Sequence, residues 1–207
     1  MTITKHERNR ARKSTMSTEF ELIESCAALA QLKDDVSLKT LIDRAQHESW
    51  RVRFAAAVAL GDRAEASTVD ALLAMLTHED GAPIYSQVEH FAGAPAGATT
   101  LATAALPVGV SEQTVECWRR RGRIKQAVCF ALGQIGPAAR QALPRLCGYA
   151  VNQKEDYAVR AAASQALGLI GDSAATDALR VASGDEEWCT KTQAAKALRA
   201  IGTAPRS

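Results

Sequence analysis

Four stretches of the chain carry the same arrangement of apolar residues. They begin at Val52, Ile124, Val159 and Thr190. In each stretch, small or apolar residues recur at offsets 0, +3, +4, +7 and +8 from the first position, and isoleucine stands at +11 in the last three, although the last stretch is more polar at its start. These offsets lie on one face of an α-helix, because a helix completes a turn in about 3.6 residues. The pattern predicts four helices of one kind, each burying one face.

Signals that end one helix and start the next recur in register with this pattern. A glycine follows an isoleucine at the end of three stretches, where a residue with left-handed backbone can close the last turn of a helix. These glycines are Gly136, Gly171 and Gly202. Asp172 and Ser173 can cap the next helix, and Pro144 suits the first turn of a helix that runs to about Val151. The predicted unit is a first helix carrying the pattern, a tight turn and a second helix.

This sequence resembles the HEAT-repeat family, in particular the short, Ala-rich variant named after phycobilisome lyases. The resemblance covers roughly residues 20–77 and 113–202. It rests on Val-Arg at 52–53 and 159–160, Ala-Leu-Gly at 59–61, 131–133 and 166–168, and Ile-Gly at 135–136, 170–171 and 201–202. It implies an all-α fold, a right-handed α-solenoid whose second helices line a concave and often binding surface. It implies no single activity, because the family includes bilin lyases, hydroxylases, relatives of DNA-repair glycosylases and plain scaffolds.

Composition agrees with packed helices and divides the chain by charge. The 207 residues include 41 Ala, and only 5% are aromatic; Ala loses no side-chain entropy in a helix. The net charge of +2 is uneven, because residues 1–15 hold five basic residues against one acidic residue. We expect residues 1–17 to be a basic, disordered tail, residues 18–203 to form the repeat domain, and residues 204–207 to be a short tail. Ser17 and Thr18 would cap the first helix.

A basic residue follows the first apolar position in every stretch: Arg53, Lys125, Arg160 and Lys191. Asp156 and Glu187 each lie four residues before a basic residue, the spacing of an ion pair on a helix. We interpret these charges as a structural ladder that ties repeats together rather than as contacts to a substrate.

Residues 79–112 interrupt the repeats with several Gly and Pro residues. The 72 residues from Leu60 to Leu132 amount to two repeat lengths, so this segment is either a degenerate repeat or a binding insertion. In the second case the contact residues would be aromatic or imidazole side chains, since aromatic residues often anchor interfaces. The candidates are Tyr85, His90 and Phe91.

The densest basic cluster follows directly. It contains Trp118, Arg119, Arg120, Arg121, Arg123 and Lys125. We place it near the start of a first helix, where arginines oppose the helix dipole, which favours a functional reason for them. The functional interpretation is contact with phosphate or an acidic partner, with Trp118 available for stacking. The structural alternative is a solvated helix face, with Lys125 serving the ladder. Without the tail and these five basic residues, the remaining chain carries −7.

The chain shows no convincing motif for catalysis or for a metal or other cofactor. The pairs His47-Glu48 and His78-Glu79 lie 31 residues apart. HEAT-type hydroxylases use His-Glu pairs, but four of them and within the first helix, so we expect no metal site here. The five cysteines form no C-x-x-C pair, which favours a reduced, cytoplasmic protein. No run reaches the roughly 18 apolar residues of a membrane span.

The sequence therefore favours a non-enzymatic scaffold or adaptor that binds another protein along its second helices. Plausible surface contacts there are Lys39, Asp70, Arg145 and Arg180. Two alternatives stay open. One is nucleic-acid binding through residues 119–125 and the basic tail. The other is a bilin lyase or lyase subunit, which rests on family analogy alone.

Overall fold

The computed structural model describes residues 5–80 and 112–203, and the side chains of residues 18–80 and 121–202. Its α-helices are α1 (Lys5–Gln31), α2 (Asp35–Arg44), α3 (Trp50–Arg63), α4 (Val69–Glu79), α6 (Glu112–Ile135), α7 (Leu143–Val151), α8 (Tyr157–Ile170), α9 (Thr176–Ala182) and α10 (Trp188–Thr203). Short 3₁₀ segments precede α4, α7 and α9. No β-strand occurs in these residues, and the predicted all-α solenoid is confirmed.

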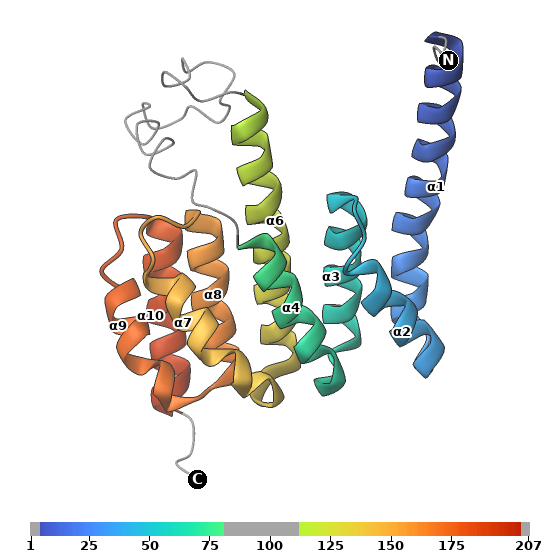
Figure 1. Cartoon of the computed structure of the whole chain (residues 1–207). Helices are drawn as coiled ribbons and strands as arrows, with labels where there is room; N and C mark the ends of the chain where they lie inside the picture. The colour runs from blue at the N-terminus through green and yellow to red at the C-terminus, as the bar shows by residue number, and fades with distance from the viewer. Residues whose placement is uncertain (1–4, 81–111, 204–207) are drawn as a thin grey trace.

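The helices form two rows, which run in Figure 1 from α1 on the right to α9 and α10 on the left. The first helices α1, α3, α6, α8 and α10 pack successively on one another. In the row of second helices, α2, α4, α7 and α9, extensive contact joins only α7 and α9. A solenoid bends toward its more closely packed row, so the first helices lie on the inner side of the bend. The resemblance had implied the second helices for this place, whereas in this chain the first helices pack on one another more extensively.

Glycine and alanine bring the first helices close together. A glycine at offset +9 of one helix faces an alanine at offset +7 of the next, in the pairs Gly61–Ala131, Gly133–Ala166 and Gly168–Ala197. A Cβ atom added at Gly168 would lie 2.7 Å from the Cβ of Ala197 and 2.8 Å from its Cα. Carbon atoms pack best at about 3.5–4.0 Å, so only glycine permits this approach. The Ala-Leu-Gly signature thus records the contact between consecutive first helices.

The predicted helix ends are confirmed at most positions. Gly136 and Gly171 have left-handed backbone, with φ of 70° and 75°. The side chain of Asp172 accepts a hydrogen bond from the N–H two residues on, and Pro144 lies in the first turn of α7. Gly202 is an exception, because α10 continues through it to Thr203.

Two boundaries differ from the expectation. The structure continues α1 back to Lys5, whereas a cap at Ser17 and Thr18 was expected. In addition, α3 packs directly against α6, and α4 also contacts α6. In the stack of described first helices, α3 is therefore followed directly by α6. The described residues form four helical hairpins followed by α10.

Candidate functional site: a groove along the first helices

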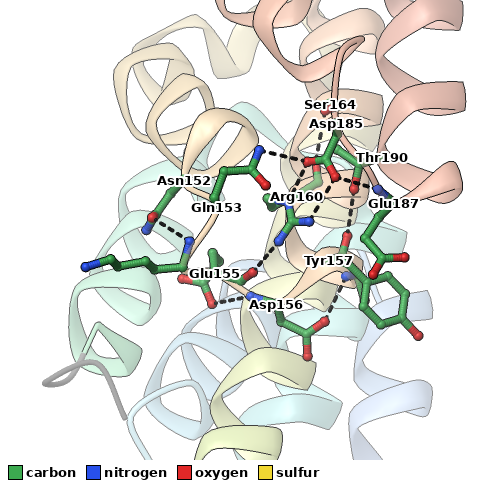
Figure 2. Close-up of polar contacts among 12 residues, drawn as sticks. Asn152, Gln153, Glu155, Asp156, Tyr157, Arg160, Ser164, Asp185, Glu187 and Thr190 are labelled. Carbon is green, nitrogen blue, oxygen red and sulfur yellow. Dashed lines mark hydrogen bonds and ion pairs between the residues drawn. The ribbon is translucent and has the colours of Figure 1, made fainter. Parts of the chain in front are cut away.

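The basic residues of the repeat lie in a buried ionic ladder at one end of the helices. Figure 2 shows its best-formed step. The guanidinium of Arg160 donates from Nε and Nη2 to the two carboxylate oxygens of Asp185, at 2.8 and 3.0 Å, and from Nη1 to the carbonyl of Glu155 at 2.6 Å. Burial would raise the pKa of Asp185, but hydrogen bonds from Arg160 and from the N–H of Glu187 hold this pKa below its ordinary value.

In the other two steps of the ladder, a buried cation likewise bonds to an acidic side chain of a neighbouring segment. Arg53 donates to Glu79 at 2.7 Å and to the carbonyl oxygen of Glu48 at 2.8 Å. Lys125 lies 2.7 Å from Glu155 and 3.2 Å from Asp80. Each cation thus joins the segment before its first helix to the end of the following second helix or the loop after it.

The ladder accounts for three of the four basic residues as structural elements. Arg53, Lys125 and Arg160 are buried, whereas Lys191 is exposed on the last first helix. Their acidic partners are Glu79, Glu155 and Asp185, which the sequence pattern did not single out. These acids lie at the end of a second helix or in the loop after it, so their spacing from the cation is 25 to 30 residues rather than four.

Residues of both His-Glu pairs form hydrogen bonds with Arg53 of the ladder. Glu79 is buried and forms an ion pair with Arg53. The Nδ1 of His47 accepts a hydrogen bond from the N–H of Ser49 at 3.0 Å. Residues 5–80 and 112–203 hold no group of three His, Cys, Asp or Glu arranged to bind a metal ion.

The binding residues suggested by the sequence fall largely outside the described part. This applies to Tyr85, His90 and Phe91, and to the side chains of Trp118, Arg119 and Arg120. Arg121 is half-buried and Arg123 is exposed. Both lie inside α6, which begins at Glu112, so the proposed opposition to a helix N-terminal dipole is wrong.

The second helices offer less free polar surface than the sequence suggested. Asp70 accepts a hydrogen bond from Gln141 at 2.8 Å, Arg145 pairs with Asp80, and Arg180 pairs with Asp177. Three of the four proposed contacts are therefore engaged within the molecule. Lys39 is exposed.

Three adjoining cavities instead form a groove along the first helices. The first, of about 580 Å³, lies between α1, α3 and α6. The second, of about 360 Å³, lies between α3, α6 and α8, and the third, of about 350 Å³, lies between α6, α8 and α10. The first two share Phe54, Val58, Asp62 and Gln126, and the last two share Gln126, Phe130 and Gln165. This surface, called the groove below, runs across the whole inner row.

The groove is built from the helix face opposite the core pattern. Its central side chains stand at offsets +2, +6 and +10 from the first apolar position of each helix. On α3 these are Phe54, Val58 and Asp62; on α6, Gln126, Phe130 and Gln134; on α8, Ala161, Gln165 and Leu169. The offsets recur but the residue types do not, so each repeat contributes a different chemistry to the same row.

Large apolar side chains are exposed in this groove, beside a core whose apolar residues are fully buried. The exposed fraction is 37% for Phe54, 38% for Phe130 and 52% for Leu169. Aromatic residues at offset −2 form one edge of the groove: Trp50, Tyr157 and Trp188, the first residues of α3, α8 and α10. A contiguous apolar patch bordered by polar groups is typical of an interaction site.

The groove also carries polar groups. Arg51 and Arg123 line the first cavity near the aromatic edge, and Asp62 lies toward the other end of α3. Neither Arg123 nor Asp62 forms an ion pair with the described residues. The groove can therefore bury apolar side chains and also bond a charged or amide group.

Comparison with known proteins agrees with the architecture. The sequence matches the family described as HEAT repeats over residues 21–89 and 120–199. The chain belongs to the HEAT-repeat family. No curated protein matches the sequence of this HEAT-repeat protein. Among solved structures, human deoxyhypusine hydroxylase in complex with glycerol is similar, with 19% identity, 88% of this chain and 80% of that chain covered, and a TM-score of 0.38. That likeness is too low to carry an argument about activity.

None of the described helices is both long and apolar enough to cross a membrane.

Proposed function

We propose that this HEAT-repeat protein is a non-enzymatic adaptor that holds another protein in the groove along its first helices. One observation carries the proposal: three adjoining cavities on the inner row, into which large apolar side chains remain exposed. Solvent contact with these side chains is unfavourable, and a partner that covers them gains about 25 cal/mol for each Å² of apolar surface removed from water. The first helices that line the groove pack on one another along its length, and a site built on packed helices has a lower ordering cost on binding than one built on loops.

The described thiols support a reducing location. Cys26, Cys129, Cys147 and Cys189 are free, as expected of the cytoplasmic adaptor that we propose.

Site-specific photo-crosslinking tests this function. A photoreactive phenylalanine derivative replaces Phe130 in the centre of the groove, and the full chain is expressed in its cell of origin. The matched control carries the same group at Val181, an exposed apolar residue of the second row. We expect a discrete crosslinked protein with the group at position 130 and not at position 181. The same products from both positions, or none from position 130, would contradict an adaptor function of the groove.

Arg123 supports nucleic-acid binding as a second candidate function. This exposed arginine lines the first cavity together with Trp50 and Phe54, on which bases can stack. Binding of a fluorescent single-stranded oligonucleotide would then weaken steeply with salt, and the Arg121→Glu/Arg123→Glu variant would bind more weakly than the wild type. An unchanged affinity in this variant removes the candidate.

A further inference from the structure

We propose that the partner enters the groove as an extended peptide segment, with its backbone held by glutamine side chains and an acidic residue directed to Arg123. This inference rests on the proposed function and specifies the kind of partner. Four glutamines on three consecutive first helices carry it. They are Gln126 and Gln134 on α6, Gln165 on α8 and Gln193 on α10.

These glutamines have unused hydrogen-bonding capacity. None of the four side-chain amides forms a hydrogen bond with the described residues, whereas Gln141 and Gln153, outside the groove, both do. Gln126, Gln134 and Gln165 surround the central cavity together. A carboxamide offers two donors and one acceptor, which match the C=O and N–H of a peptide group.

The unused amides favour an extended partner over a helical one. In a helix, the backbone N–H and C=O groups are bonded internally, so glutamines beside it would find only side chains. An extended segment brings unpaired backbone groups into the groove, and burial of such groups is unfavourable unless a partner bonds them. Gln126 and Gln165 are placed to supply that bond beside the apolar cavities.

The spacing of the cavities specifies the apolar residues of the segment. Packed helices lie about 8–10 Å apart, so neighbouring cavities repeat at about that distance. An extended chain in the polyproline II conformation rises about 3.1 Å per residue with three residues per turn, so every third side chain falls on the same side about 9.3 Å further on. A β-strand places same-side residues only about 6.6–6.8 Å apart. We therefore expect apolar residues at positions i, i+3 and i+6.

The two ends of the groove carry different cations. Arg123 is exposed at the first cavity and has no ion-pair partner among the described residues. Nearby, Arg51 lies 5.4 Å over the ring of Trp50 and 3.7 Å from the carboxylate of Glu19. The third cavity contains Lys196 but no arginine. An acidic residue next to the apolar residue of the first cavity would complement this end.

Peptide selection on the full chain tests the inference. A displayed library of random dodecapeptides is selected against the wild-type protein, and the enriched peptide is synthesised. We expect apolar residues at i, i+3 and i+6 with an acidic residue beside one of them, and no helical circular dichroism from the bound peptide. Gln126→Ala and Gln165→Ala should each weaken its binding about 3–10-fold, the loss expected for one hydrogen bond. The matched control, Gln141→Ala on the second row, should bind as the wild type does.

Backbone methylation separates backbone recognition from simple packing. N-methylation of the peptide amide that faces Gln126 should weaken binding to the wild type but add little loss in the Gln126→Ala variant. An apolar spacing of i, i+4 and i+7 with a helical spectrum overturns the inference, as do glutamine variants that bind like the wild type. If the library yields no peptide while Phe130 still crosslinks a partner, the extended-segment inference fails and the adaptor function stands. If both experiments fail, both proposals fall.

Discussion

The contact between glycine and alanine on neighbouring first helices predicts a large difference between two chemically identical substitutions. Gly168→Ala places a Cβ atom 2.7 Å from the Cβ and 2.8 Å from the Cα of Ala197. One of these atoms belongs to the backbone, so α8 and α10 must separate by about 1 Å to restore ordinary carbon contacts. Gly148→Ala, on the exposed face of α7, meets nothing within 4 Å.

The magnitudes follow from packing and helix propensity. Overpacking of a well-packed site costs about 1–3 kcal/mol, and replacement of glycine by alanine in a helix returns about 0.5–1 kcal/mol. Gly168→Ala should therefore lower the free energy of unfolding by roughly 1–2 kcal/mol, while Gly148→Ala should raise it by up to about 1 kcal/mol. Since 1 kcal/mol shifts the melting temperature of a domain of this size by about 2–4 °C, the two variants should melt several degrees apart.

Thermal and urea unfolding, followed by far-UV circular dichroism, measure both variants against the wild type. A Gly168→Ala variant as stable as Gly148→Ala would refute the reasoning, because the close approach of the first helices would then not depend on glycine.

Three further outcomes follow from the ladder and the thiols. Arg160→Met should lower the free energy of unfolding, measured by urea titration, by about 3–5 kcal/mol, because it leaves the carboxylate of Asp185 buried without its cation. The control Arg180→Met removes an exposed ion pair and should change this free energy by less than about 1 kcal/mol. The pKa of Asp185 is lower in the folded than in the unfolded protein, so its carboxylate stabilises the fold above the ordinary pKa of 3.8 and loses this effect as the pH falls through the folded pKa. The difference in free energy of unfolding between the wild type and Asp185→Asn should therefore narrow below about pH 4. A difference that is constant with pH contradicts this. Native alkylation with iodoacetamide, followed by peptide mass spectrometry, should modify exposed Cys189 and spare Cys129, whose pKa is raised by burial; equal labelling of the two would contradict the structure.

The core of this fold was predictable because the same helix face packs in the same way in every repeat. Val159 and Ala162 lie on a face that packs in the same way in each unit, so their offsets recur and the period is visible in one sequence. Three of the four ladder cations were predictable for the same reason. Their acidic partners were not, because Glu79 ends α4 whereas Asp185 lies in the loop after α9, and the separation of cation and acid along the chain varies between 25 and 30 residues.

The groove escaped sequence analysis for the opposite reason. Phe54, Gln126 and Ala161 share offset +2 but share no chemistry, so no repeat signal connects them. The place of the groove could have been deduced from Gly61 and its counterparts, which show that the first helices pack most closely and so line the inner side. The sequence offered one more indication of the groove, the aromatic residues Phe54 and Phe130 at offsets outside the core pattern.

The last first helix departs from the glycine pattern in a way that bears on assembly. At offset +9, where α3, α6 and α8 have glycine, α10 has the exposed residue Arg199. A stack of identical hairpins can add another copy at an open end, and such head-to-tail contacts generate filaments when the rotation between copies does not close. A helix approaching α10 as closely as α10 approaches α8 would collide with the arginine side chain. The outer face of α10 therefore lacks the glycine surface through which the other first helices pack on their neighbours.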